Sequence, residues 1–257
     1  MRAQEKDNAM AAPSEWWRNF FHGTMVEGWL AAMPNEMTQK EADFVQKVLQ
    51  VTPPAKLLDA PCGGGRHSLA LAARGYNLTS VDISPTFLEA ARAKANPGPG
   101  KVTWEERDMR DLPWPSSVDG AYCMGNSFGY YDDAGNEAFI RAVARALKPG
   151  ARFVLNTDYL TEGLLPVLQE RAWYEMGGIL CLTSRRYDPA DGRLYVEYTT
   201  IRDGKVEKWS MSARLHTLRE VRRLFEAAGF TNLCAYSSLA QEPFQFGSRQ
   251  LYLVGTR

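Results

Sequence analysis

A glycine turn between an apolar strand and a helix constrains this chain more than any other feature. Residues 56–59 read as a short buried strand, residues 63–65 are three glycines, and a second apolar strand ends in Asp82. Strand, turn, helix and strand form a βαβ unit, which builds a parallel sheet with a right-handed crossover. The glycines let the backbone approach a ligand closely, and the carboxylate that ends the second strand is placed to accept hydrogen bonds from two ribose hydroxyls. The unit therefore predicts a nucleoside ligand.

A further carboxylate, Asp59, ends the first strand shortly before the turn. A loop that binds only phosphate does not need this acceptor, and Asp59 would repel a pyrophosphate. The spacing Gly63-x-Gly65-x-x-Ser68 also lacks the third glycine of the dinucleotide fingerprint. Two carboxylates suit a ligand with a ribose and a cationic group, such as S-adenosylmethionine. A dinucleotide-binding oxidoreductase stays open as a less favoured alternative, and so does a purely structural role for both carboxylates as helix caps.

Strand and helix patterns alternate from Ala55 to Asn156, which predicts a doubly wound, mostly parallel α/β sheet of seven strands. After it, three alternating runs separated by turns that contain Asp-Gly predict an inserted antiparallel meander over about 171–216. Thr217 is expected to cap a helix that ends at Gly229. The expected strands of the sheet are 55–59, 78–82, 102–107, 118–124, 152–156, 231–236 and 250–255, the expected helices between them are 66–74, 84–95 and 137–147, and the runs of the meander are 173–187, 194–202 and 206–215.

The N-terminal region divides into a polar tail at residues 1–12 and an aromatic segment at residues 14–33, which has helical spacing. Thr38 and Glu41 are spaced as a capping box at the start of a further helix. We therefore expect residues 1–37 to form a tail with a helical lid segment, and residues 38–257 to form the ligand-binding domain.

Composition limits the classes of function. The chain has 30 basic and 30 acidic side chains, so no overall attraction to nucleic acid or to an anionic membrane is expected. Its four cysteines are far apart, which argues against a zinc site and against a disulfide framework. No signal-peptide pattern or apolar run of about 18 residues is present. We expect a cytoplasmic protein with no membrane segment and no metal site.

Three stretches resemble the class I S-adenosylmethionine-dependent methyltransferases: residues 58–68, 81–84 and 147–151. Within that family the chain is similar to the small-molecule branch, in which strands inserted after the fifth strand cover the active site or pair subunits. The resemblance implies the Rossmann-like methyltransferase fold, S-adenosylmethionine as cofactor, a small-molecule methyl acceptor with an O, N or C nucleophile, and a possible homodimer through the inserted strands. RNA methylation and a non-catalytic S-adenosylmethionine-binding module remain alternatives.

The resemblance also implies a cofactor seat along the ends of the strands. Asp59, Gly63 and Gly65 would face the methionine part, and Arg66 is a candidate contact of the cofactor carboxylate. Asp82 would hold the ribose hydroxyls. The remaining contacts would come from Ile83 against the adenine, from Asp108 and Met109 capping its edge, and from Met124, Gly125 and Asn126 beneath the sulfonium.

The acceptor side is less defined. Asn126 is followed by Ser-Phe-Gly rather than by the Pro-Pro-Tyr/Phe of enzymes that methylate nucleobase amino groups or glutamine, which disfavours those substrates. Trp17 and Phe20 are expected to contribute to a lid that excludes water. Candidates for a general base or a substrate contact are His216, Tyr130 and Asp158, because imidazole, phenol and carboxylate groups accept protons.

Overall fold

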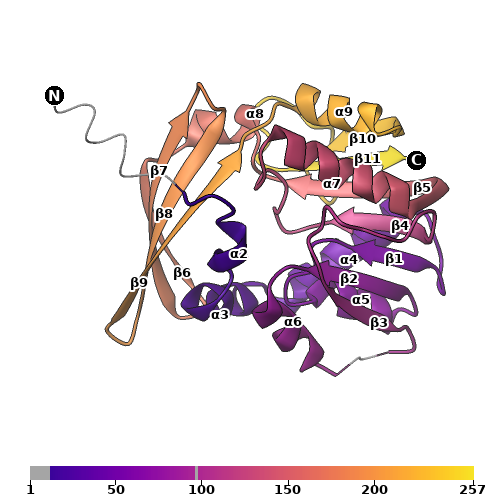
Figure 1. The fold of residues 1–257 in the computed structure, drawn as a ribbon, viewed down its shortest axis with the longest axis horizontal. Helices are drawn as coiled ribbons and strands as arrows, with labels where there is room; N and C mark the ends of the chain where they lie inside the picture. Colours follow the sequence, from indigo (N-terminus) through magenta and orange to yellow (C-terminus); the bar gives the residue numbers. More distant parts are fainter. Residues whose placement is uncertain (1–11, 96–97) are drawn as a thin grey trace.

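The computed structural model describes residues 12–95 and 98–257, which fold into two sheets joined by helices (Figure 1). The larger sheet has seven strands in the order β10-β11-β5-β4-β1-β2-β3. Only β11 runs against its neighbours, so the expected mostly parallel seven-stranded sheet is confirmed. Its strands are β1 Lys56–Asp59, β2 Asn77–Asp82, β3 Val102–Glu106, β4 Val118–Cys123, β5 Leu147–Thr157, β10 Thr231–Tyr236 and β11 Leu251–Thr256.

Helices cover both faces of this sheet, and their ends follow local capping chemistry. Ser84 accepts a hydrogen bond from the Phe87 backbone NH at the start of α6, and Thr217 forms a capping box with Glu220 at the start of α9. α4 and α5 share one apolar core with the sheet, and α7 and α9 share the other. The helices are α4 Asn35–Leu49, α5 Arg66–Ala73, α6 Pro85–Arg92, α7 Asp133–Ala146 and α9 Leu218–Ala227.

Two helix starts differ from expectation. α4 begins at Asn35, so Thr38 lies inside its first turn and is not the N-cap. Glu41 is therefore not a capping-box partner, and its carboxylate instead contacts the side chains of α5. α7 begins at Asp133, four residues before the expected start, because the Asp132 carboxylate caps it by accepting a hydrogen bond from the Gly135 backbone NH.

The inserted region forms a separate antiparallel sheet of four strands, β6 Arg171–Met176, β7 Ile179–Asp188, β8 Arg193–Arg202 and β9 Lys205–Arg214. The expected meander is thus confirmed. The expectation of one continuous run over 173–187 is wrong, because Gly177 and Gly178 adopt φ +59° and +78° and turn the chain back between β6 and β7. Because the residues on both sides of this glycine pair are apolar, the sequence pattern reads as one strand and does not reveal the turn.

The N-terminal helices α2 Trp17–Phe20 and α3 Gly23–Ala32 lie between the two sheets (Figure 1). Trp16, Phe20 and Met25 are buried in one apolar core with the inner side chains of the inserted sheet. The Thr24 hydroxyl shares a hydrogen bond with Thr200 at 2.9 Å. The N-terminal helices and the inserted sheet therefore form one packed unit over the edge of the larger sheet. The expected tail at residues 1–12 lies almost wholly outside the described residues.

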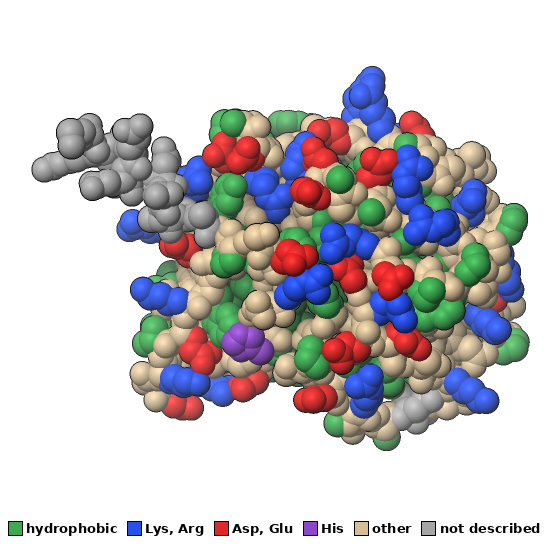
Figure 2. Space-filling view, viewed as in Figure 1, with side chains coloured by type: hydrophobic (Ala, Val, Ile, Leu, Met, Phe, Trp, Pro, Cys, Tyr) green, Lys and Arg blue, Asp and Glu red, His purple; other side chains and the backbone are tan. Residues whose placement is uncertain are grey.

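Basic and acidic side chains alternate over the face in Figure 2, in keeping with the zero formal net charge. Trp173 and Val206 project from the outer face of the inserted sheet, and the expected homodimer through these strands stays a prediction. Within residues 12–95 and 98–257, no helix combines the length and the apolar character needed to cross a membrane.

Candidate active site

A cavity of about 690 Å³ opens between the carboxyl ends of the parallel strands, the N-terminal helices and the inner face of the inserted sheet. This is the edge at which ligands bind in doubly wound α/β sheets, and the volume lies in the range of small-molecule sites. Of the residues singled out from the sequence, the cavity wall includes Trp17, Phe20, Gly63, Arg66, Asp82, Ile83, Met109, Met124, Gly125, Asn126, Tyr130 and Asp158.

Asp82 and Gly63 form the centre of this wall. The Gly63 backbone NH donates to one carboxylate oxygen of Asp82 at 2.7 Å, and the Ser84 backbone NH donates to the other at 2.9 Å. Burial raises the pKa of Asp82 to about 6 despite these bonds. Gly63 has φ +50°, and no described atom lies within 4 Å of the position that a Cβ would occupy. The turn thus presents bare backbone and a fixed carboxylate to the cavity.

The other two glycines of the turn serve packing. A Cβ on Gly65, which has φ +72°, would overlap the Trp104 ring, and Gly65 is not part of the cavity wall. A Cβ on Gly64 would overlap the end of the Leu30 side chain. Since Leu30 belongs to α3, the lid segment packs directly on the turn.

Asp59 lies beneath the turn rather than in the cavity wall. It is 1% exposed and accepts a hydrogen bond from the Ser68 hydroxyl at 2.5 Å, and Ser68 also contacts Ser80 at 2.7 Å. Burial raises the pKa of Asp59 to about 7. The side chain therefore links β1 to α5, and its expected contact with the methionine part of the cofactor stays a prediction. Burial also raises the pKa of the nearby Cys62 thiol well above its usual value, which disfavours a nucleophilic cysteine.

Arg66 is in the cavity wall and is held by α4. Its guanidinium forms an ion pair with Glu41 and donates to the Thr38 hydroxyl at 3.2 Å. Glu41 also contacts His67 Nε2 at 3.0 Å. Burial alone would raise the pKa of Glu41, but the bonds from His67 and Arg66 hold it at about 2. This network fixes a cation beside the glycine turn.

Around the ends of β2 and β3, Ile83 and Met109 present apolar surface to the cavity. Asp108 does not reach the cavity wall, because Arg110 binds its carboxylate through two nitrogens at 2.9 and 2.6 Å. The Tyr131 hydroxyl donates to the same carboxylate at 3.1 Å. In this structure the Asp108 carboxylate is engaged by these local partners, and its contact with an adenine amino group stays a prediction.

The ends of β4 and β5 meet at Asn126. Its side-chain oxygen accepts hydrogen bonds from the Thr157 hydroxyl at 3.1 Å and from the Asp158 backbone NH at 2.9 Å. Asn126 itself has φ +67°, and Gly125 before it has φ +87° with no described atom within 4 Å of its Cβ position. This segment is therefore a second place where bare backbone borders the cavity.

Asp158 and Tyr130 line the part of the cavity that lies toward the inserted sheet. Oδ1 of Asp158 is buried and has no hydrogen-bond partner among the described residues. Burial raises the pKa of Asp158 to about 6, against the opposing charges of Arg185 and Arg249. A carboxylate with a pKa near neutrality and an unused acceptor atom is suited to receive a proton or a hydrogen bond from a ligand.

His216 is outside the cavity wall. It is buried against Phe128, with 5.0 Å between the ring centroids, and burial lowers its pKa to about 4. The meander carries His216 past the end of β9 to a bridge with Leu160, away from the cavity. Of the three acceptor-side candidates, the structure thus brings together Tyr130 and Asp158 but not His216.

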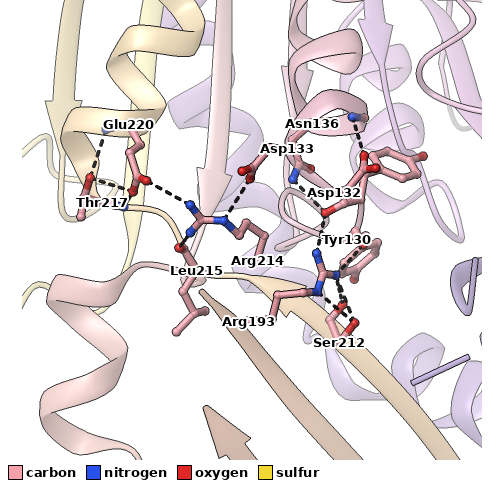
Figure 3. Close-up of polar contacts among 12 residues, drawn as sticks. Tyr130, Asp132, Asp133, Asn136, Arg193, Ser212, Arg214, Leu215, Thr217 and Glu220 are labelled. Carbon is pink, nitrogen blue, oxygen red and sulfur yellow. Dashed lines mark hydrogen bonds and ion pairs between the residues drawn. The ribbon is translucent and has the colours of Figure 1, made fainter. Parts of the chain in front are cut away.

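Two arginines of the inserted sheet hold it to the segment after β4 (Figure 3). Arg193 donates to the backbone oxygens of Tyr131 at 2.9 Å and of Tyr130 at 3.1 Å. Arg214 pairs with Asp133 at 3.0 Å and with Glu220, in the first turn of α9, at the same distance. These bonds fix the position of Tyr130 relative to the inserted strands.

Sequence reasoning missed the cavity residues that the inserted sheet contributes. Arg185 and Tyr198 project from its inner face, and Tyr159 follows β5. The alternation of side chains along a strand could have assigned Arg185 to the same face as Cys181 and Thr183. It could not have shown that this face closes over the ends of β4 and β5.

Comparison with known proteins agrees with this geometry. Residues 57–150 match the family model of a methyltransferase domain. The chain is 29% identical over 158 residues to a ubiquinone biosynthesis O-methyltransferase of Xylella fastidiosa (strain 9a5c), an alignment that covers 61% of this chain and 59% of the relative. The chain thus spans less than two thirds of that curated relative.

Solved structures share the fold over nearly the whole chain. The CcbJ methyltransferase from Streptomyces caelestis matches with a TM-score of 0.75 at 14% identity, covering 93% of this chain and 98% of the other. S-adenosylmethionine-bound CalS10, an amino pentose methyltransferase from Micromonospora echinaspora, matches with a TM-score of 0.66 at 18% identity and the same coverages.

Residues 57–150 match a methyltransferase domain, and the fold over nearly the whole chain is the Rossmann-like fold of solved methyltransferases. The chain is thus similar to methyltransferases in sequence and to S-adenosylmethionine-dependent methyltransferases in fold. The residues of the cavity wall fit S-adenosylmethionine. Asp82 has a fixed carboxylate at the end of β2, and no described atom lies within 4 Å of the position that a Cβ would take on Gly63 or Gly125. Apolar side chains from the ends of β2 and β3 lie on the same wall.

Proposed function

We propose that this protein transfers a methyl group from S-adenosylmethionine to an oxygen, nitrogen or carbon nucleophile of a small molecule. The observation that carries the proposal is one cavity whose wall includes both the family's cofactor-binding segment and Asp158. Donor and acceptor are then held in one enclosed space, and alignment of two reactants is worth up to about 7–11 kcal/mol in favourable cases.

When bound, the sulfonium of the cofactor supplies a methyl group that is already activated. The residues of the chain bind, orient and exclude water. Asp82 is placed to accept the ribose hydroxyls, and Ile83 and Met109 offer apolar surface for the adenine. Arg66, held by Glu41, is a cation for the cofactor carboxylate. The backbone at Gly125 and Asn126 borders the region of the sulfonium.

Where the methyl acceptor would bind, Oδ1 of Asp158, which has no hydrogen-bond partner among the described residues, is the candidate proton acceptor. Tyr130 is a candidate substrate contact beside it. Closure over both comes from the lid segment, because Trp16 packs edge-on against Tyr130 with 4.8 Å between ring centroids. Exclusion of water by these rings strengthens electrostatic interactions inside the cavity.

A small-molecule acceptor suits a cavity of about 690 Å³ lined by Tyr130, Tyr159 and Tyr198 better than a folded RNA does. The curated relative is named for O-methylation and the CalS10 neighbour for methylation of an amino pentose, so these names do not decide among oxygen, nitrogen and carbon.

Two measurements test the proposal. Calorimetric titration should show binding of S-adenosylhomocysteine and no binding of NAD⁺ or NADH. Incubation with methyl-labelled S-adenosylmethionine and a nuclease- and protease-treated metabolite extract should place the label in a small molecule. Binding of S-adenosylhomocysteine without any transfer would favour a non-catalytic binding module, and label in RNA alone would favour the RNA alternative.

A further inference from the structure

Arg185 is a charged residue on an otherwise largely apolar surface. It lies on β7 and faces inward with Cys181, opposite Val196 of β8 in the pairing register. The inner face around it includes Leu194, Val196 and Met211, which belong to a buried apolar core. Arg185 is also part of the cavity wall. The Arg185 guanidinium is thus directed from a largely apolar sheet face into the part of the cavity lined by Asp158 and Tyr130. We call this part the acceptor half of the cavity.

Among the described residues, no carboxylate forms an ion pair with this group. Within residues 12–95 and 98–257, the Arg185 guanidinium makes neither a hydrogen bond nor an ion pair within 4.0 Å, and only its backbone NH is engaged, with the Glu170 oxygen at 2.7 Å. Other arginines of the cavity wall are paired: Arg66 with Glu41, and Arg107 with Asp111 at 2.5 Å. Arg185 therefore differs from the cations that the fold itself uses.

A second cation lies nearby. Arg249, in the loop before β11, is part of the same cavity wall and likewise has no ion pair in the described part of the chain. The charges of Arg185 and Arg249 both act on the Asp158 carboxylate. The acceptor half of the cavity thus has two unpaired cations around one carboxylate.

A partly desolvated cation without a partner is unfavourable, and a planar guanidinium matches carboxylate and phosphate oxygens through parallel hydrogen bonds. We infer that the methyl acceptor is an anion, a small molecule whose carboxylate or phosphate group binds Arg185 while its nucleophilic atom faces Asp158. Arg249 adds to the attraction at the rim of the cavity. The inference rests on the proposed function, since it assigns the acceptor of that same site.

The test uses ring compounds because aromatic side chains line the cavity. Protein saturated with S-adenosylhomocysteine is titrated calorimetrically with 4-hydroxybenzoate, with 4-hydroxyphenyl phosphate and with the neutral 4-hydroxybenzamide. We expect at least one of the two anions to bind about tenfold or more tightly than the amide, and the stronger anion identifies the group as carboxylate or phosphate. Equal binding of all three probes, or binding of none, would overturn the inference in the unmodified protein.

Variants then locate the effect. Arg185→Gln should remove the preference for the anion and leave the affinity for S-adenosylhomocysteine unchanged, whereas Arg185→Lys should retain part of the preference. Arg171→Gln, on the outward-facing side of the neighbouring strand β6, is the matched control and should change neither. A preference that survives in Arg185→Gln would refute the assignment. Weakened S-adenosylhomocysteine binding in that variant would also refute it, because Arg185 would then serve the cofactor.

The two proposals fail differently. Absence of S-adenosylhomocysteine binding in the unmodified protein counts against the methyltransferase proposal itself. Normal S-adenosylhomocysteine binding without any preference for an anion counts only against the anionic acceptor.

Discussion

Asn126 holds Asp158 in place: its side-chain oxygen accepts a hydrogen bond from the Asp158 backbone NH at 2.9 Å. The two residues follow the ends of neighbouring parallel strands, β4 and β5, and they are 32 positions apart in the chain. The same oxygen accepts from the Thr157 hydroxyl, so both backbone and side-chain donors of β5 converge on one amide. This contact joins the expected cofactor side of the cavity to its acceptor side.

The first prediction concerns the pH dependence of methyl transfer. Because burial raises the pKa of Asp158 to about 6, the transfer rate should fall as the pH is lowered through about 6, where the proton acceptor becomes protonated. The rate at saturating substrate is measured from pH 5 to 8. Asp158→Asn should lower the rate and abolish this fall of the rate at low pH, the acidic limb of the pH profile. A limb that persists in Asp158→Asn would exclude Asp158 as its origin.

The second prediction treats Asn126 as a positioning residue. Asn126→Ala removes the acceptor that holds the Asp158 backbone, and a small displacement of a reacting group lowers the rate by about ten- to a hundredfold. Asn126 also helps to keep the Asp158 carboxylate charged, so its loss should move the acidic limb to higher pH. A slower variant with an unmoved limb would point to a structural role only.

The third prediction concerns cofactor affinity. Asp82→Ala removes the carboxylate offered to the ribose, and charge-assisted hydrogen bonds are worth about 1.5–3 kcal/mol. The dissociation constant of S-adenosylhomocysteine, measured by calorimetry, should rise about tenfold or more. Asp43→Ala, on the exposed side of α4, is the control and should leave it unchanged. Unchanged affinity in Asp82→Ala would rule out the ribose assignment.

The fourth prediction concerns folding stability. Asp59 has its pKa raised to about 7 by burial, so the folded state binds a proton that the unfolded chain releases at about pH 4. The stability that this group contributes is present at low pH and is lost as the pH rises through about 7. Relative to the unmodified protein, Asp59→Asn should therefore gain stability as the pH is raised from 4 to 8. Urea unfolding at each pH measures the difference, and a flat difference would contradict the buried-acid description.

The fifth prediction separates two costs at Gly65. Gly65→Ala places a methyl group both at φ +72° and against the Trp104 ring. Gly178→Ala has a similar backbone conformation, φ +78°, in open space, and should cost only about 1 kcal/mol. Overlap in the core should add about 1–3 kcal/mol to the cost at Gly65. Equal losses of unfolding free energy would show that Trp104 moves away freely.

Local patterns allowed much of the larger sheet to be predicted. Apolar runs and the residues that end them identified all seven strands, and Ser84 and Thr217 marked helix starts correctly. Some errors arose where a residue had a distant partner. Glu41 of α4, for example, is spaced for a capping box with Thr38 but forms an ion pair with Arg66 of α5. Short-range spacing does not reveal such an alternative.

For the candidate site, residues at strand ends could be placed because parallel strands end at one edge of a sheet. Asp82, Asn126 and Asp158 all line the cavity for that reason. Asp59 and Asp108 also end strands, but their carboxylates are taken by Ser68 and Arg110, so neither reaches the cavity. Which strand-end side chain faces the ligand depends on neighbours that the order of residues does not disclose.

By itself, the sequence determined the βαβ unit around the glycine turn and the carboxylate at its end, because strand periodicity, turn glycines and caps act over a few residues. Only the tertiary structure decided the acceptor half of the cavity. Arg185 and Asp158 come to line one space because the inserted sheet folds back over the ends of β4 and β5. That closure depends on a core shared with the N-terminal helices and on the Arg193 bonds to the backbone, which are contacts between distant segments.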